Sequence, residues 1–168
     1  GIAGTNSGTI TQSYATGALN AGGRYVYLGG LVGRMTGGSV SNAYATSALT
    51  SGGFGNGSLN YVGGLIGAMS GGTVSSTYAT GLISTSGGGG LVYQRTAGTV
   101  SNSFWDTSTT GRSTSAGGTG RTTTQMKTAS TFTGAGWSSS NWGLAITAYC
   151  GTGLWSDTCT WWISPTPA

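Results

Sequence analysis

Charged side chains are scarce in this chain of 168 residues: they make up 5% of it, against about 25% in an average soluble domain. Histidine and glutamate are absent, and the only acids, Asp106 and Asp157, lie in different parts of the C-terminal region. Hydrolysis of a glycosidic bond usually needs two carboxylates about 5–10 Å apart. A serine nucleophile would need Lys127 as its base, and no motif places the two together. The sequence therefore predicts a chain that is not an enzyme and holds no cofactor.

Positive charge is also sparse, and it is dispersed. The net charge of +4 arises from six cations that stand singly along the chain: Arg24, Arg34, Arg95, Arg112, Arg121 and Lys127. Proteins that bind nucleic acids carry lysine and arginine clustered on one face or along one element. We therefore expect these cations to act as solubilising groups, and we expect no nucleic-acid partner.

Cysteine and long apolar runs are nearly missing too. The two cysteines, Cys150 and Cys159, have no further cysteine or histidine with which to hold zinc, so we expect no metal site. A disulfide between them is the simplest interpretation and indicates an oxidising compartment, with a free or intermolecular thiol pair as the alternative. No apolar run approaches the ~20 residues of a membrane helix, and we expect no membrane span.

Glycine, serine and threonine take the place of the missing residue types, and they recur in register. A ten-residue phrase begins at Gly8, Gly38, Gly72 and Gly98 and reads GTITQSYATG, GSVSNAYATS, GTVSSTYATG and GTVSNSFWDT. A shorter phrase reads GGLVG, GGLIG and GGLVY, starting at Gly29, Gly63 and Gly89. Such self-similarity indicates stacked units that bury their apolar edges against their neighbours. Because the chain opens with GIAG, like the end of the shorter phrase, we expect either a fragment of a longer array or a processed chain.

The longer phrase has the alternation of a β-strand with one buried face, because each copy places a β-branched apolar residue between two hydroxyl residues. The predicted inward column is Ile10, Val40, Val74 and Val100. The predicted outward hydroxyl ladder is Thr9, Thr11, Ser39, Ser41, Thr73, Ser75, Thr99 and Ser101. We predict an all-β solenoid, a parallel β-helix of about four coils over residues 1–104, in which each coil adds ~4.8 Å.

Two further columns follow from the same register. Amide side chains stacked at strand spacing can hydrogen-bond along an array, and the predicted polar column is Gln12, Asn42, Ser76 and Asn102. The predicted aromatic column, which would pack in the core or at an edge, is Tyr14, Tyr44, Tyr78 and Phe104. The glycines of the shorter phrase would mark corners with positive φ or a close approach of two coils.

Length differences between the repeats fall in three stretches, residues 18–28, 48–62 and 82–88, which we predict to be loops on one side of the stack. Aromatic residues in or beside these loops are the candidate binding residues, because aromatic side chains suit sugars and other weakly polar partners. They are Tyr25, Tyr27, Phe54 and Tyr61. Packing of the loops onto the coil is the alternative role for these four residues.

The repeat ends near residue 104, and the composition changes over residues 105–168, which we predict to form a capping or association segment. All six tryptophans lie there: Trp105, Trp137, Trp142, Trp155, Trp161 and Trp162. We expect them, together with the disulfide, to close the last coil, whose strands would otherwise be exposed edges. The stretch TTTQ from Thr122 has the form of a capping box and predicts one short helix through about Ala129.

The pairing of the two phrases resembles the GLUG motif, which recurs in large surface and secreted proteins of bacteria, including filamentous-haemagglutinin-like adhesins. The stretch from Asn102 to Gly134 is similar to the segment that often closes such arrays, so the resemblance covers roughly residues 1–137. The resemblance implies a right-handed β-helix or a related solenoid, export, and attachment at the cell surface. The chain departs from the pattern at Tyr93, which replaces the last glycine of the shorter phrase, and residues 148–168 match nothing in it.

These observations favour a non-enzymatic, extracellular or cell-surface module with a structural or adhesive role. Its expected partners are neighbouring repeats of a longer chain, or surface glycans and host or abiotic surfaces. One alternative is a subunit of a head-to-tail extracellular filament, in which the molecule is its own partner, because an exposed strand edge at one end of a solenoid can pair with the other end. A second alternative is an ice-binding solenoid that uses the threonine and serine ladder.

Overall fold

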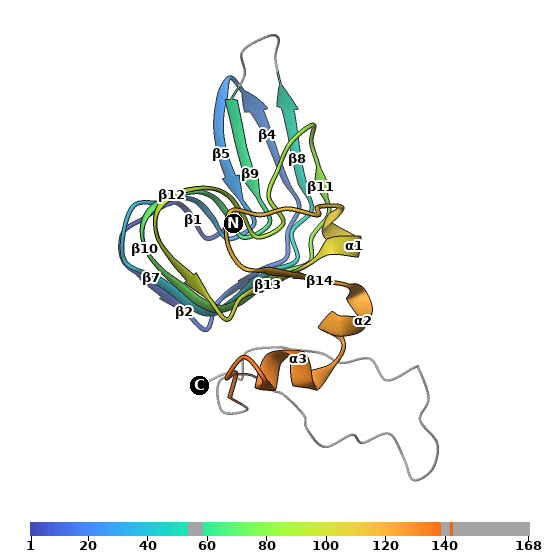
Figure 1. Cartoon of the computed structure of the whole chain (residues 1–168). Coiled ribbons are helices and arrows are strands. Elements are labelled where there is room, and N and C mark those ends of the chain that lie inside the picture. The colour runs from blue at the N-terminus through green and yellow to red at the C-terminus, as the bar shows by residue number, and fades with distance from the viewer. Residues whose placement is uncertain (54–58, 139–141, 143–168) are drawn as a thin grey trace.

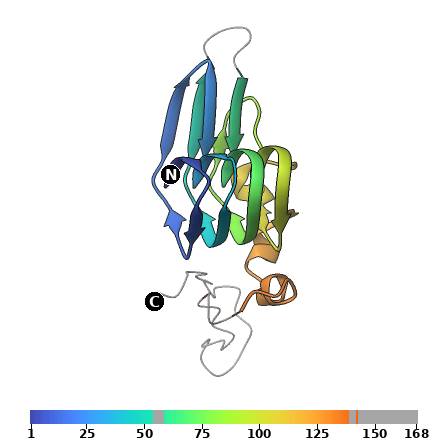
Figure 2. The same ribbon diagram turned by 90° about the vertical axis from the view of Figure 1, so that its left-hand side faces the viewer.

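The computed structural model of the chain describes residues 1–53, 59–138 and 142. Its repeat region is all-β and forms a β-solenoid of about three turns (Figure 1). Seen from the side, the turns lie next to one another, in order along the chain (Figure 2). The sequence predicts about four coils, and the structure has fewer. The four copies of the longer phrase supply four neighbouring strands to one wall, but only three turns of the chain connect these four strands.

Three walls of parallel strands surround the core of the solenoid. The first wall contains β1 (Ala3–Asn6), β6 (Val32–Met35), β10 (Ile66–Ala79) and β12 (Val92–Ser101). The second contains β2 (Thr9–Thr11), β7 (Ser39–Ala45), β10 and β12. The third contains β3 (Tyr14–Ala15), β7, β10, β13 (Phe104–Asp106) and β14 (Thr119–Arg121). Corresponding residues of successive repeats therefore lie side by side along the stack.

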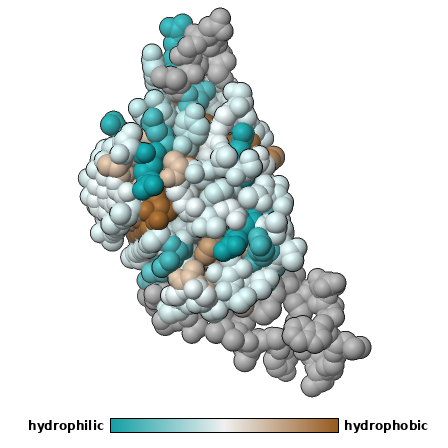
Figure 3. Space-filling model, in the orientation of Figure 1, coloured by the Kyte–Doolittle hydropathy of each residue, from teal (hydrophilic) through white to brown (hydrophobic). Residues whose placement is uncertain are grey.

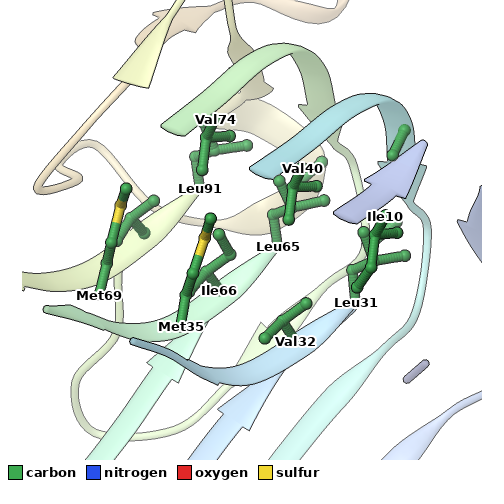
Figure 4. Packing of buried hydrophobic residues seen from close by; sticks show 14 of the residues in the cluster. Ile10, Leu31, Val32, Met35, Val40, Leu65, Ile66, Met69, Val74 and Leu91 are labelled. Carbon is green, nitrogen blue, oxygen red and sulfur yellow. The ribbon is translucent and has the colours of Figure 1, made fainter. Parts of the chain in front are cut away.

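The core consists of the same few aliphatic positions repeated once per turn (Figure 4). Ile10, Val40 and Val74 point inward and are buried, as predicted, and each lies close to the leucine of a shorter phrase. Full burial of such a side chain stabilises the fold by about 1.5–3 kcal/mol. The fourth member of the predicted column, Val100, is only half-buried because it belongs to the last strand of its wall, where Gly117 packs against it.

The predicted polar column has a backbone explanation. Its four residues all adopt the left-handed conformation, with φ between 46° and 51°: Gln12, Asn42, Ser76 and Asn102. They turn the chain from the second wall to the third. Asparagine enters this region more readily than most residues because its short polar side chain can bond locally. A polar residue at this position of each repeat is therefore expected from the turn alone.

The first two variable stretches are largely strands where the structure describes them, so the prediction of loops is wrong for these two, whereas residues 82–88 contain only two strand residues. Strands of all three stretches lie on the same side of the stack. They form an arm that projects from the solenoid (Figure 1). One layer of the arm contains β4 (Leu19–Gly23), β8 (Leu49–Gly53) and β11 (Ile83–Ser84), and the other contains β5 (Tyr25–Gly29) and β9 (Leu59–Gly63). The arm is ordered because Leu49, Val62 and Ile83 are buried between its layers. The stacking of repeats thus continues into the segments whose lengths differ.

The C-terminal region continues the third wall past the predicted boundary at residue 104, since β13 spans it and β14 pairs with β13. Three short helices follow or flank these strands: α1 (Thr107–Thr110), α2 (Thr123–Met126) and α3 (Ala129–Thr133). The capping box of Thr122 and Gln125 is confirmed, with both reciprocal hydrogen bonds present. The single predicted helix is two helices, because α2 ends at Met126 and α3 begins at Ala129.

The described tryptophans close the solenoid in a different way from the one predicted. Trp105 belongs to the core cluster and lies against Gly90, so it does cover the last turn. Trp137 and Trp142 instead pack along the side of the stack, against Tyr78, and Trp142 also reaches Tyr44. The reason is that the aromatic column offers them a flat apolar surface on the third wall. The other tail tryptophans, Trp155, Trp161 and Trp162, and the predicted disulfide of Cys150 and Cys159 lie outside the described residues.

Candidate binding face

Tyr25 and Tyr27 lie on the outer face of the arm. They alternate along β5 with Val26 and Leu28, and Leu28 packs against the buried cluster between the two layers. The period of two along a strand therefore turns both tyrosines away from that cluster. Tyr25 is 70% exposed and Tyr27 is 42% exposed. Both candidate binding residues therefore have side chains that a partner could reach.

The arm pairs Tyr27 with Tyr61 across two successive turns. The parallel register of β5 and β9 places the two residues directly opposite each other. Their rings are stacked, with centroids 4.8 Å apart and planes 11° from parallel. Offset stacking of aromatic rings stabilises such a pair by about 0.5–1.5 kcal/mol beyond the burial of its area.

Tyr93 extends this pair into a row of three tyrosines. The Tyr93 and Tyr61 rings meet in a T-shaped arrangement, with centroids 5.9 Å apart. The third repeat lacks a tyrosine in its arm, because Gly87 stands two residues before Gly89, where Tyr61 stands two residues before Gly63. The Tyr93 hydroxyl lies 3.9 Å from the place where a Cβ of Gly87 would be. A tyrosine from the wall therefore fills the position that the shorter arm leaves empty.

The departure of Tyr93 from the repeat phrase has a steric basis. At the corresponding position of the second turn, a Cβ on Gly67 would lie 2.5 Å from the Tyr61 carbonyl oxygen and 2.6 Å from that of Gly33. The arm strands approach the wall too closely there for a side chain. The third turn has only the short strand β11 and a single bridge at Gly89, so a side chain fits. Sequence reasoning missed Tyr93, although the lost glycine was its signal.

We call Tyr27, Tyr61 and Tyr93 the tyrosine row. The guanidinium carbon of Arg34 lies 5.5 Å from the centre of the Tyr27 ring, a distance at which cation and ring attract each other. Stacking turns the ring faces of Tyr27 and Tyr61 toward each other, so these two rings present their edges and phenol hydroxyls to solvent. Tyr25 is the most exposed tyrosine of this region. Phe54, the fourth predicted binding residue, lies outside the described residues.

The predicted hydroxyl ladder lies on the second wall. The register aligns its eight members in two rows, Thr9, Ser39, Thr73, Thr99 and Thr11, Ser41, Ser75, Ser101. Ser39 Oγ donates a hydrogen bond to Thr9 Oγ1 at 3.4 Å, and Ser41 Oγ donates to Thr11 Oγ1 at 3.2 Å. In the first two turns the hydroxyls are thus bonded to each other along the stack.

A second tyrosine stack lies on the third wall, and the tail covers most of it. Tyr14, Tyr44 and Tyr78 stack with centroids 5.2 Å and 4.9 Å apart. Tyr14 is 57% exposed at one end, while Tyr78 is buried under Trp137 and Trp142. Burial, and then the neighbouring Tyr44, raises the pKa of the Tyr78 phenol well above its ordinary value of about 10. This stack therefore serves packing.

Charged residues in the described part of the chain are mostly engaged in structural contacts. Asp106 is 2% exposed, caps α1 through the backbone N–H groups of Ser108 and Thr109, and accepts a hydrogen bond from the Thr123 hydroxyl at 3.0 Å. It is the only acid among the described residues, where no cluster of three or more metal-ligating side chains occurs. No helix in that part of the chain is long and apolar enough to span a membrane.

Comparison with known proteins identifies the repeat. A family model described as the GLUG motif matches residues 25–50, which run from β5 of the arm through the first wall into β8. The matched segment thus holds the first member of the tyrosine row, the GGLVG phrase, and one full copy of the longer phrase. No curated protein and no solved structure matches the chain.

Proposed function

This chain is a GLUG-motif repeat protein, and from that premise we propose that it is a structural and adhesive module of an exported surface protein, without catalytic activity. In this proposal the solenoid acts as a rigid support, and the outer face of the arm binds carbohydrate. Expected locations are the extracellular medium or the cell surface, with neighbouring repeats of a longer chain or surface glycans as partners.

One observation carries the proposal: tyrosines from three successive turns, together with Tyr25, lie on one face. Tyr25, Tyr27 and Tyr93 are the largest exposed side chains of this face, and Arg34 lies beside them. Tyrosine combines an apolar ring with a polar hydroxyl and so suits partners that are partly polar, as sugars are. The surface seen in Figure 3 is mostly near neutral in hydropathy, with scattered hydrophilic groups and few hydrophobic ones.

A non-catalytic role is consistent with the use of the polar groups. Asp106, the one described acid, is buried and holds the start of α1 and the adjacent α2 segment. Arg95 and Arg112 donate to backbone carbonyls and so fix the end of the solenoid. These three side chains therefore serve hydrogen bonds that stabilise the fold.

A glycan array tests the proposal directly. The full chain should retain a defined set of glycans, and Tyr25→Ala or Tyr27→Ala should lose most of that signal. Tyr14→Ala is the matched control, because Tyr14 is also an exposed stacked tyrosine but lies on the third wall. Loss of signal in all three variants, or in none, would refute the assignment of the arm face.

The hydroxyl ladder supports ice binding as a second candidate, because its register gives two straight rows of hydroxyls on one wall. The bonds between Ser39 and Thr9 and between Ser41 and Thr11 weaken this candidate, since those hydroxyls already have partners. Thermal hysteresis measured on the full chain decides the matter: a value equal to that of buffer would exclude ice binding.

A head-to-tail filament remains a third proposal. Strands of the first turn, such as β1 and β2, are paired on one side, to β6 and β7. An unpaired strand edge is a template for another chain. Light scattering and electron microscopy over a wide range of protein concentrations test this, and discrete monomers throughout would argue against a filament.

A further inference from the structure

We propose that the ligand of the arm face is an acidic polysaccharide, whose carboxylate or sulfate groups are bound by Arg34 and by the hydroxyls of the tyrosine row. The inference rests on the proposed carbohydrate-binding function and adds the chemical class of the ligand. The polysaccharide would lie along the stack, crossing Tyr27, Tyr61 and Tyr93 in turn.

Arg34 is a cation at the surface with unused donors. It is exposed on β6, contacts the Tyr27 ring, and donates no hydrogen bond to an atom of the described residues. A guanidinium presents five N–H donors in a plane that matches a carboxylate or a sulfate. The Tyr27 ring holds this group at the end of the row, so its orientation is partly fixed before a ligand arrives.

Three arginines in the second half of the chain are less available than Arg34, because two of them donate hydrogen bonds within the fold and the third is partly buried. Arg95 donates to the carbonyl oxygens of Gly98 and Ala116, and Arg112 donates to those of Ile83 and Thr85. Arg121 lies over the Phe104 ring. Arg24, in contrast, is exposed at the turn between β4 and β5, next to Tyr25. Free positive charge on the described solenoid is therefore found at the arm.

No exposed carboxylate opposes that charge within residues 1–53, 59–138 and 142. Asp106 is the single acid there, and it is buried and capped. An anionic chain approaching the arm face therefore meets attraction from Arg24 and Arg34 without repulsion from a described acid. Charge complementarity of this kind raises the association rate and selects against cationic partners.

The stacking of the tyrosine row argues for the same ligand class. The ring faces of Tyr27 and Tyr61 are turned toward each other, with planes 11° apart, and Arg34 lies over the Tyr27 ring. A neutral sugar that binds by laying its ring on an aromatic face would therefore find little open face on these two tyrosines. The row offers three phenol hydroxyls as donors, on rings whose centres are 4.8 Å and 5.9 Å apart, and the Arg34 guanidinium adds more donors. Such a surface suits a ligand rich in acceptor oxygens.

A nucleic acid is also an anionic chain, but the arm face fits it less well. Single-stranded nucleic acids bind by stacking bases on open aromatic faces, and the stacked rings of Tyr27 and Tyr61 offer few such faces. Affinity for phosphate chains grows with the number of cations in contact, and the arm has two free arginines. We therefore argue for the polysaccharide and include a nucleic acid in the test.

The experiment compares an oligogalacturonate with its fully methyl-esterified form, in which each charged carboxylate is replaced by a neutral methyl ester on the same sugar backbone. Isothermal titration of the full chain should show binding of the acid and at least about tenfold weaker binding of the ester, as expected when hydrogen bonds to a charged group are lost. Arg34→Gln should reduce the affinity for the acid by a similar factor and leave that for the ester unchanged. Lys127→Gln is the control, since it removes the same charge from an exposed position on the C-terminal region.

Each outcome decides the inference. Equal affinity for acid and ester, or equal losses in Arg34→Gln and Lys127→Gln, would overturn it, while the proposed carbohydrate binding would stand. Failure of both oligosaccharides to bind would overturn it as well, and the glycan array would then show whether carbohydrate binding fails too. Tighter binding of single-stranded DNA than of the acid, lost in Arg34→Gln, would replace the polysaccharide with a nucleic acid.

Discussion

At the scale of single residues, each copy of the longer phrase places one residue other than glycine in the left-handed backbone conformation. Gln12, Asn42, Ser76 and Asn102 share this conformation although their side chains differ. The left-handed region costs a residue with a Cβ about 1–2 kcal/mol, which asparagine offsets in part by local hydrogen bonds. Ser76 offsets this cost least through local hydrogen bonds, so the cost of the left-handed conformation is most easily measured at position 76.

Replacement of Ser76 tests the backbone role of the column. Ser76→Gly should raise the free energy of unfolding by up to about 1 kcal/mol, because glycine adopts positive φ without a steric penalty. Ser76→Val should lower it by about 1–2 kcal/mol, because a β-branched residue is strained there. Denaturant titration measures both. If the side chain of the column mattered more than its backbone, both variants would be destabilised alike.

The buried phenol of Tyr78 lowers the stability of the solenoid as the pH becomes alkaline. Burial and the neighbouring Tyr44 favour the protonated phenol in the folded chain, so its pKa lies above that of the unfolded chain. The contribution of this group to stability is complete below pH 10 or so and falls as the pH rises further, because the unfolded chain then loses its proton first. Tyr78→Phe should unfold with a weaker dependence on alkaline pH. Tyr14→Phe, at the exposed end of the same stack, should behave like the wild type, and equal slopes in all three proteins would disprove the effect.

At the scale of elements, the structure differs from the sequence prediction in the arm and in the tail. The column of Ile10, Val40 and Val74 was predictable because alternation within a strand is a local pattern. The arm was not predictable, because its strands pair between successive turns whose variable stretches differ in length. The only sign of this pairing in the sequence is that Tyr27 and Tyr61 lie at equivalent positions of two repeats. The contact of Trp142 with Asn42 joins residues 100 positions apart, and no local pattern announces it.

The tail segment is held on the third wall partly by this contact. Trp142 Nε1 donates to Asn42 Oδ1 at 3.1 Å, and the indole packs on Tyr44 and Tyr78. A double-mutant cycle isolates the hydrogen bond: Trp142→Phe keeps a ring but removes the donor, and Asn42→Gly removes the acceptor but keeps the left-handed backbone. We expect a coupling energy of about 0.5–1.5 kcal/mol in denaturant titrations. Strictly additive effects would mean that the two groups do not interact in solution.

At the scale of the whole molecule, the solenoid stacks its repeats in register, and the repeat pattern changes at the turn where the arm is shortest. Gly33 and Gly67 are required because the arm strands lie against the wall, and Tyr93 takes the third position because the last arm is short. The sequence predicted the repeat, and with it the candidate residues Tyr25, Tyr27 and Tyr61. The extension of the row to Tyr93 depends on how far the arm extends in space, and the spacing of the phrases in the sequence does not reveal this distance.

The variant Tyr93→Gly tests this account most directly, because it restores the glycine of the phrase and removes only the third ring of the row. Titration with an oligogalacturonate long enough to cross three turns should show about tenfold weaker binding than in the wild type, and the unfolding transition should show that the variant remains folded although it has lost the ring contact with Tyr61. An affinity equal to that of the wild type, in a variant that remains folded, would contradict the claim that successive turns build one binding row.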